Sequence, residues 1–282
     1  MHPSIRTVYT IKVNGQNAEP GPDMVVVEEP LELLLGTGAG NLRKRTALAV
    51  TMRTPGHDEE LALGFLFTEG ILAQRSDLLQ LRIMSENSLL VEFNPEIYVD
   101  LNRLSRNMFA NSSCGVCGKA SLDAVQTNAV YFSVPGQPVV APEVIYKMPD
   151  ALRQAQEAFE RTGGLHAAGL FTHLGELVVL REDVGRHNAV DKVIGSALKM
   201  GLSFPLKDHV LMVSGRAGFE LVQKASMAGL PWLVAVGAPT SLSVELAESC
   251  GMTLVGFLRG QRFNVYSHPE RLLFPVEKEA NP

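Results

Sequence analysis

The sequence predicts an α/β protein, α+β overall, with a small β-rich N-terminal domain and a larger α/β domain whose sheet is mainly parallel. Short alternating or apolar runs dominate the first part of the chain, whereas strands alternate with helical patterns in the second part. Strand–helix alternation implies right-handed crossovers and parallel pairing. The expected domains are a β-rich domain over residues 1–101, a flexible loop and junction over 102–140, and an α/β domain over 141–282.

The first hundred residues contain several strand patterns and one helical pattern. Strands are expected over residues 7–15, 23–30, 31–36 and 45–53, with a turn at Asn14 and Gly15 and with Pro30 and Gly36 closing the two middle runs. Residues 57–70 predict a helix, because acidic residues open it and Gly70 stands where a C-terminal cap belongs. Residues 78–94 predict a hairpin that turns at Ser85, Glu86 and Asn87.

The second half begins with a helical pattern over 142–163 and a hairpin pattern over 166–183 that turns at Gly175. A helix with an apolar stripe follows over 187–201. The remaining expected elements are strands over 209–214, 232–237, 253–260 and 262–267, and helices over 217–229 and 241–251. No internal repeat interrupts this order, which is that of an open sheet with crossover helices.

Composition excludes several classes of function. The 282 residues carry a net charge of -5 and 20% charged residues, a balance that gives no signature of a nucleic-acid partner. No stretch reaches the roughly 18–20 apolar residues of a membrane span, and the first residues lack the apolar run of a signal peptide. We therefore expect a cytoplasmic protein without a membrane partner, whose three cysteines remain thiols.

Polar, small and basic residues follow three strands of the second half. They are Ser214, Gly215 and Arg216 after the first strand, Gly237, Thr240 and Ser241 after the second, and Arg259 and Arg262 at the end of the third. Ligands of open α/β sheets bind beyond the carboxyl ends of the strands, and helix starts with arginines suit a phosphate. Each loop alone is also an ordinary turn. Three loops with three arginines together favour an anionic ligand.

The segment 181–192 is the densest polar cluster of the chain. One reading is structural: Asn188 caps the following helix, and Asp191 suits its dipole. The other reading is functional, because the cluster lies at a strand-to-helix corner that opens the same half of the chain. The residues alone leave both readings open.

Cys114 and Cys117 form a CxxC pair in a loop rich in glycine and serine, "SSCGVCGKAS". A disulfide staple is disfavoured in a reducing compartment. A zinc site of the nucleobase deaminase type would pair the CxxC with His57-x-Glu59, but Ser113 stands where that motif has proline. We interpret His57, Asp58 and Glu59 instead as residues that open a helix, and predict no bound metal. Open glycine neighbours favour a thiol that transfers sulfur as a persulfide.

The third cysteine, Cys250, lies in an apolar helical pattern and is expected to pack as a small hydrophobic residue.

Several stretches together resemble the FdhD/NarQ family of formate dehydrogenase accessory sulfurtransferases. They are "RTPGHDEELALGFLFTEGI", "SSCGVCGKAS", "REDVGRHNAVDKVIG", "FNVYSHPERL" and the long run from 213 to 260. The resemblance implies a larger domain that is cytidine-deaminase-like without the deaminase metal, a homodimer, and transfer of sulfur from a cysteine desulfurase to the molybdenum cofactor, bis-(molybdopterin guanine dinucleotide), for formate dehydrogenase.

By the same resemblance, Cys114 matches the persulfide cysteine and Cys117 the second cysteine of the pair. The stretch assigned to cofactor binding corresponds to Phe257, Leu258, Arg259, Gly260, Gln261 and Arg262. If the ligand is this cofactor, we expect Arg186 to contact a phosphate and His187 or Asn188 to contact the edge of the pterin or guanine. Two alternatives remain beside sulfur transfer: a chaperone that binds the cofactor without carrying sulfur, and a zinc-dependent hydrolase of the deaminase type.

Overall fold

The computed structural model describes residues 4–40, 43–99, 131, 133 and 135–273. The chain forms two compact units from interleaved stretches. The first comprises residues 1–128, 156–167 and 181–202, and the second comprises 129–155, 168–180 and 203–282. The consecutive division at 101 and 140 stays a prediction, because most of the segment between those positions lies outside the described residues.

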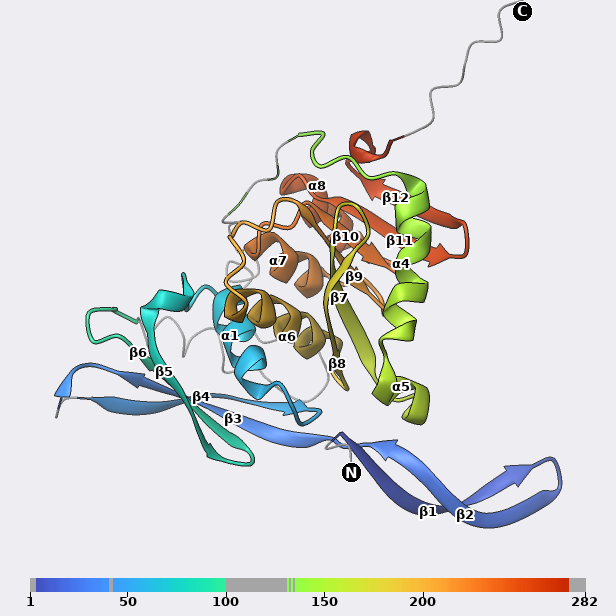
Figure 1. Cartoon of the computed structure of the whole chain (residues 1–282), viewed down its shortest axis with the longest axis horizontal. Helices are drawn as coiled ribbons and strands as arrows, with labels where there is room; N and C mark the ends of the chain where they lie inside the picture. The colour runs from blue at the N-terminus through green and yellow to red at the C-terminus, as the bar shows by residue number, and fades with distance from the viewer. Residues whose placement is uncertain (1–3, 41–42, 100–130, 132, 134, 274–282) are drawn as a thin grey trace, which may run out of the picture. The chain divides into compact units, whose positions relative to one another are not determined.

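The first unit begins with a two-stranded ribbon, β1 (Ile5–Asn14) and β2 (Asn17–Val26). The strands pair antiparallel from Ile5 opposite Val26 to Asn14 opposite Asn17. Gly15 in the turn has a φ of 61°, a conformation that glycine adopts without steric cost. The expected hairpin turn is confirmed, and the ribbon is drawn in dark blue in Figure 1.

A four-stranded sheet follows, with the order β4-β3-β6-β5. Its strands are β3 (Glu29–Thr37), β4 (Lys44–Arg53), β5 (Leu78–Ser85) and β6 (Ser88–Phe93). The β5–β6 hairpin is confirmed, but the role given to Pro30 is wrong: this residue lies inside β3 instead of ending a run. Pro30 is tolerated there because β6 joins β3 only from Glu32 onward.

Two helices of the first unit, α1 (Asp58–Thr68) and α6 (Arg186–Lys199), pack against each other through glycine. A Cβ atom on Gly64 would collide with the carbonyl oxygen of Asp191, and one on Gly195 would collide with that of Glu60. The absence of these side chains therefore permits the close approach of the two backbones. Gly70, with a φ of 71°, follows the end of α1 as expected.

The helix expected over 142–163 is two helices, α4 (Pro142–Gln154) and α5 (Glu157–Thr162). The second unit contains α4 and the first contains α5, so the break falls at the boundary between Ala155 and Gln156. The new helix start is stabilised by a distant carboxylate, because Glu182 accepts hydrogen bonds from the backbone N–H groups of Ala158 and Phe159 at 3.2 and 3.0 Å. The predicted end at Gly163 is confirmed.

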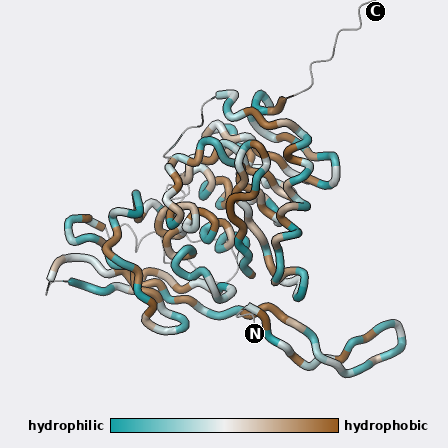
Figure 2. Tube along the Cα trace, viewed as in Figure 1, coloured by the Kyte–Doolittle hydropathy of each residue, from teal (hydrophilic) through white to brown (hydrophobic). Residues whose placement is uncertain are grey.

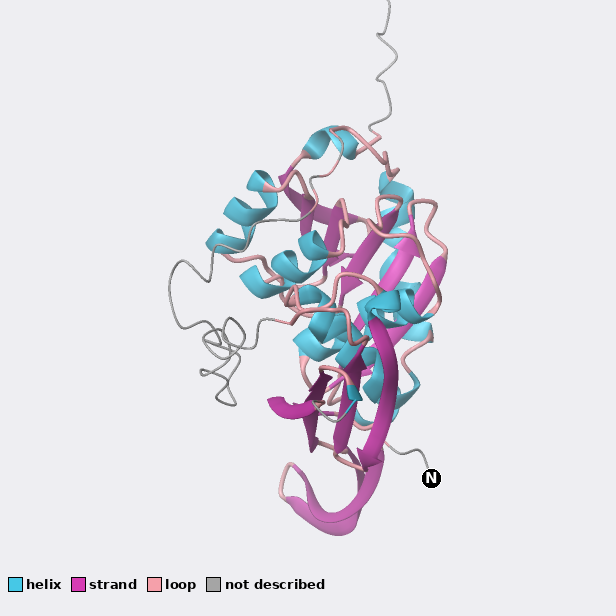
Figure 3. Ribbon diagram, turned by 90° about the vertical axis from the view of Figure 1, so that its left-hand side faces the viewer, coloured by secondary structure: helices cyan, strands magenta, loops and turns pink. Residues whose placement is uncertain are grey.

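A six-stranded sheet with the order β12-β11-β10-β9-β7-β8 forms the centre of the second unit. The start of β7, up to Ala167, and the end of β8, from Arg181, belong to the first unit. Its strands are β7 (His166–Thr172), β8 (Leu177–Asp183), β9 (His209–Val213), β10 (Trp232–Ala235), β11 (Thr253–Arg259) and β12 (Arg262–Ser267). Helices α7 (Phe219–Met227) and α8 (Ser241–Ser249) connect the three central strands. They cover one face and α4 covers the other (Figures 1 and 3).

The expectation of a mainly parallel sheet is correct only for its centre. β9, β10 and β11 pair parallel, whereas β7 pairs antiparallel with β9 and β12 antiparallel with β11. Only Gly260 and Gln261 separate β11 from β12, too few residues for a crossover. The chain also reverses direction between β7 and β8 at Gly175, and α6 follows β8 before the chain enters β9, which lies beside β7. The predicted fold class, α/β and α+β overall, is therefore confirmed as a mixed α and β architecture.

The core of the second unit lies on the central strands, whose hydrophobic residues are visible in Figure 2. Trp232 is fully buried, and its Nε1 donates to the carbonyl oxygen of Pro138 at 3.0 Å. Cys250 is buried at the end of α8 as predicted, and burial raises the pKa of its thiol. Within the part of the chain that the structure describes, no helix is long and apolar enough to cross a membrane.

Candidate functional site

The loops that follow β9 and β10 and the last part of β11 are joined by backbone hydrogen bonds at one edge of the sheet. Gly237 donates to the carbonyl oxygen of Gly215 at 3.0 Å, and Ala217 donates to that of Ala238 at 3.1 Å. Phe257 in turn donates to the carbonyl oxygen of Gly237 at 3.1 Å. The convergence expected from the positions of the strands is therefore present in the structure.

Close packing makes this edge a fixed surface. A Cβ atom on Gly237 would lie 2.9 Å from the backbone nitrogen of Arg216, and one on Gly256 would lie 2.8 Å from Cδ of Pro239. Both distances are too short for a real Cβ contact, so the loops meet where only glycine fits. Thr240 completes the edge as the N-cap of α8, where its Oγ1 accepts from the backbone N–H of Ser243 at 3.3 Å.

Three arginines leave positive charge uncompensated at this edge. Arg216, Arg259 and Arg262 are exposed, and none forms a hydrogen bond or ion pair through its guanidinium group with any residue that the structure describes. Arg259 and Arg262 also lie directly opposite each other in the β11–β12 register. Like charges in that position repel each other, and a bound anion would offset the repulsion.

The remaining predicted residues of this edge differ in exposure. Phe257, Gly260 and Gln261 are exposed, and Ser214 and Gly215 are half-buried. Leu258 is only 1% exposed and belongs to the core, so its side chain does not face a ligand at the surface.

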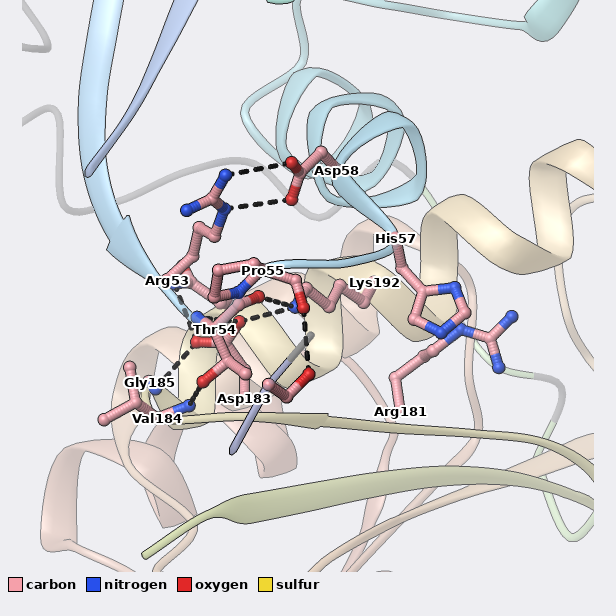
Figure 4. A network of polar contacts seen from close by, with 12 residues as sticks. Arg53, Thr54, Pro55, His57, Asp58, Arg181, Asp183, Val184, Gly185 and Lys192 are labelled. Atoms are coloured by element: carbon pink, nitrogen blue, oxygen red, sulfur yellow. Dashed lines mark hydrogen bonds and ion pairs between the residues drawn. The ribbon is translucent and has the colours of Figure 1, made fainter. Parts of the chain in front are cut away.

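The polar cluster of 181–192 lies in the first unit and has a buried ion pair at its centre (Figure 4). Lys192 donates to the carboxylate of Asp183 at 2.7 Å and to the carbonyl oxygen of Thr54 at 2.8 Å. Asp183 is 0% exposed and Lys192 is 1% exposed. Asp183 also accepts from the backbone N–H groups of Thr54 and Gly185 at 3.1 and 2.8 Å. These bonds satisfy a charge pair that would otherwise be costly to bury.

Asn188 belongs to the same network. Its amide nitrogen donates to the carbonyl oxygen of Met52 at 2.8 Å and to Asp183 at 3.0 Å, and its oxygen accepts from Thr51 at 3.3 Å. The expectation that Asn188 caps the helix is wrong, because α6 starts earlier and Gly185 is its N-cap. Contact between Asn188 and the edge of a heterocycle stays a prediction.

Arg186 and His187 occupy the first turn of α6, which contains no acidic residue. Cations are unfavourable at the positive end of a helix dipole. Nε of Arg186 is buried and has no hydrogen-bond partner among the described residues. A neighbour that the sequence did not single out is His166: burial, then the charges of Arg186 and His187, lower its pKa, although Asp183 opposes the shift. The sequence gave no sign of this electrostatic environment, because His166 is simply the first residue of a strand.

The residues of the alternative zinc motif open α1, as interpreted from the sequence. His57 is the N-cap of α1, and Asp58 and Glu59 stand in its first turn. Asp58 pairs with Nε of the buried Arg53 at 3.0 Å, and Nδ1 of His57 lies 3.4 Å from the carboxylate of Glu60. Among the described residues, no cluster of His, Cys, Asp and Glu is suited to hold a metal ion.

Glu60 is buried and contacts the side chains of Arg181 and His57. It accepts from Nη2 of Arg181 at 2.9 Å and is paired with His57. Burial alone would raise the pKa of Glu60, but the hydrogen bonds and charges of Arg181 and His57 outweigh it and lower the pKa from 4.5 to about 2. Cys114 and Cys117 lie outside the described residues, so their predicted roles rest on the sequence.

Comparison with known proteins places these features in a family. Residues 26–273 match the model of the FdhD/NarQ family. A protein of Streptomyces coelicolor named "Sulfur carrier protein FdhD" is 49% identical over 272 residues, which cover 93% of each chain. One of the same name from Sulfolobus acidocaldarius is 43% identical over 268 residues, covering 95% of this chain and 98% of the relative.

A crystal structure described as a formate dehydrogenase accessory protein from Desulfotalea psychrophila has the same fold, with a TM-score of 0.73. The two sequences are 23% identical, and the superposition covers 96% of this chain and 100% of the other. The fold and the sequence matches agree, and the chain belongs to the FdhD/NarQ family.

Proposed function

We propose that this protein is a sulfur carrier that passes persulfide sulfur from a cysteine desulfurase to the molybdenum cofactor, bis-(molybdopterin guanine dinucleotide), during maturation of formate dehydrogenase. The observation that carries the proposal is the identity of 49%, across 93% of both chains, with a protein named as a sulfur carrier. The cofactor is the substrate of this transfer, and we infer that the protein performs it as a cytoplasmic homodimer.

The CxxC pair supplies the chemistry of the proposed transfer. The thiolate of Cys114 attacks the terminal sulfur of the desulfurase persulfide, a new S–S bond forms, and the desulfurase cysteine leaves as a thiolate. In delivery, the thiolate of Cys117 attacks the inner sulfur of the Cys114 persulfide. A disulfide forms between the two cysteines and sulfide leaves for the molybdenum. A cellular dithiol then reduces the disulfide and restores both thiols.

The edge formed by the loops after β9, β10 and β11 supports the second half of the proposal. A molybdopterin guanine dinucleotide carries phosphates, and the edge carries three exposed arginines beside two helix starts, none of them paired with a residue that the structure describes. The residues proposed to bind it are Ser214, Gly215, Arg216, Thr240 and 257–262, with Arg186, His187 and Asn188 as further candidates. Arg186 is the best supported of the last group, because its buried Nε has no partner among the described residues.

Mass spectrometry after incubation with desulfurase and cysteine tests the carrier role. The expected result is the gain of one sulfur atom on the peptide that contains Cys114, lost in Cys114→Ala. Cys250→Ala is the matched control and should still gain sulfur, because Cys250 is buried. If the chain gains no sulfur but binds the cofactor, it is a chaperone and not a carrier. Stoichiometric zinc with hydrolytic activity would instead favour the deaminase-type alternative.

Complementation tests the same role in the cell. Cys114→Ala should abolish formate dehydrogenase activity in a strain that lacks the natural protein, while the abundance of the dehydrogenase stays the same. Full activity with Cys114→Ala would contradict the assignment of this cysteine as the carrier.

A further inference from the structure

The ribbon of β1 and β2 has one face that is almost entirely apolar. Residues directly opposite each other in an antiparallel pair point to the same face, and successive residues of a strand alternate between faces. The register therefore places on one face the odd-numbered residues of Ile5–Val13 in β1 and the even-numbered residues of Ala18–Val26 in β2. Apart from Thr7, these residues are aliphatic, aromatic, proline or methionine. We call this surface the apolar ribbon face.

The outer half of the apolar ribbon face is exposed. Tyr9, Ile11 and Val13 are 86%, 66% and 71% exposed, and the residues opposite them in β2 are exposed as well. The base of the face is better covered, because Met24 is 37% exposed and its sulfur accepts from Nη2 of Arg161 in α5 at 3.5 Å. Adjoining hydrophobic side chains that are this exposed mark an interaction surface.

The charges of the ribbon lie on its other face and are compensated there. Lys12 is paired with Asp23 at 3.6 Å and lies directly opposite Glu19. Arg6 is paired with Glu29 at 3.7 Å. The apolar ribbon face therefore presents no charge by which a partner could be selected. The surface that complements it is another uncharged, apolar face.

Strand addition at the edges of the ribbon would not cover this face. Pairing with β1 continues through Pro20 and Pro22, so the N–H groups that these residues lack would point to the open edge of β2. That edge is therefore a poor template for a further strand. A strand added to the edge of β1 would leave the apolar side chains in water, whereas the backbone groups of an open edge are hydrated. Only packing of one face against another removes these side chains from water.

We propose that the apolar ribbon face packs against the same face of a second copy of the chain, and that this contact is the core of the homodimer. A two-fold axis makes such a contact self-complementary, because both copies contribute the same residues. Two strands of 10 residues form a face of roughly 34 by 10 Å, so two such faces bury roughly 700 Å² in projection, most of the ~1,000 Å² that a specific interface needs. This interface belongs to the homodimer of the proposed function and therefore rests on that function.

Sedimentation equilibrium of the full chain tests this interface. Ile11→Lys places a charge in the middle of the apolar ribbon face and should weaken the dimer at least about 30-fold, the equivalent of the ~2 kcal/mol of an interface hot spot. Thr10→Lys is the matched control and should leave the dimer unchanged, because Thr10 is exposed on the opposite face of the same strand.

Photo-cross-linking locates the contact while the apolar surface stays in place. Benzoylphenylalanine at position 9 replaces one aromatic side chain by another and should cross-link to residues 5–26 of a second copy. A mixture of isotope-labelled and unlabelled chains separates, by mass, the links between copies from those within one copy. Benzoylphenylalanine at position 10, on the opposite face, should give no link between copies.

If Ile11→Lys dimerises as strongly as the unsubstituted chain, or if the links from position 9 fall outside residues 5–26, the homodimer stands but the apolar ribbon face is not its interface. If the unsubstituted chain is a monomer at every concentration, the homodimer of the proposed function is wrong and the interface falls with it. Sulfur gain at Cys114 is measured separately and tests the carrier role, whichever surface forms the dimer.

Discussion

The segments 181–192 and 257–262 both carry charged residues, but they differ in whether those residues have partners of opposite charge. In the first, Asp183 and Lys192 are buried, paired at 2.7 Å and bonded to the backbone around them. In the second, Arg259 and Arg262 are exposed, lie opposite each other and have no ion-pair partner among the described residues. Charge that is internally satisfied stabilises a fold, whereas charge left unsatisfied at a rigid edge is available to a ligand.

The largest effect that this contrast predicts comes from removing Lys192. Lys192→Met leaves the buried carboxylate of Asp183 unpaired, which should cost about 3–5 kcal/mol of the free energy of unfolding of the first unit. Lys199→Met is the matched control on the same helix: its pair with Glu59 is exposed, so the cost should be about 0–1 kcal/mol. Urea unfolding followed by circular dichroism measures both. Equal costs would mean that burial does not distinguish the two pairs.

The single tryptophan separates the response of the two units. Trp232 lies in the second unit and is fully buried, so its fluorescence reports the unfolding of that unit. Far-ultraviolet circular dichroism reports both units. A loss of stability confined to the first unit should therefore appear in circular dichroism at lower urea than in fluorescence.

A second effect concerns the dependence of stability on pH. The pKa of Glu60 in the folded chain is about 2 and therefore lies below its ordinary value of 4.5. Its ionised form stabilises the fold at pH values above about 4.5, and this contribution is lost as the pH falls toward 2. The shift corresponds to at most about 3 kcal/mol. Glu60→Gln should be less stable at neutral pH and should lose less stability on acidification.

Glu59→Gln is the control for this pH dependence, because Glu59 forms an exposed pair with Lys199. Urea unfolding from about pH 2 to about pH 6, a range that includes both the ordinary and the lowered pKa of Glu60, should show the same acid sensitivity in this variant as in the unsubstituted chain. If Glu60→Gln keeps the full acid sensitivity, the carboxylate of Glu60 is not its source.

Local patterns predicted most of the elements but not the long-range contacts that modify them. The hairpin that turns at Gly175 and the strands and helices from β9 to β12 follow from alternation and apolar stripes. The break between α4 and α5 does not, because the carboxylate of Glu182 that stabilises the new helix start is more than twenty residues away in sequence. The antiparallel pairing of β11 with β12 could have been expected from the short turn that joins the two strands.

The candidate sites show the same limit. The loops after β9, β10 and β11 could be placed together from the rule that ligands bind at the carboxyl ends of strands. The structural role of Asp183 could not be predicted from the local sequence. Its partner Thr54 comes from a distant segment, and its partner Lys192 lies further along α6. His166 also escaped notice, since its environment is created by Arg186 and His187, about twenty residues later in the chain.

A third effect tests whether the glycine contact between α1 and α6 supports the buried network. Gly195→Ala would place a methyl group against the carbonyl oxygen of Glu60, and the two helices would have to separate. The expected cost is about 1–3 kcal/mol, as for other overpacked contacts. Gly21→Ala is the control, because a Cβ atom there meets nothing within 4 Å. A neutral Gly195→Ala in urea unfolding would show that the helices can move apart freely.

The smallest effect is expected at the exposed edge and has the opposite sign. Arg259→Gln removes one of two like charges that lie opposite each other, so the second unit should become more stable by about 0.2–1 kcal/mol. Trp232 fluorescence during urea unfolding measures this gain, and low salt should enlarge it because ions screen exposed charges. The same variant should bind pyrophosphate more weakly. A residue whose removal stabilises the fold and weakens the ligand is kept for binding. If Arg259→Gln instead destabilised the second unit, the guanidinium group would have a structural role, and the contrast with Lys192 would disappear.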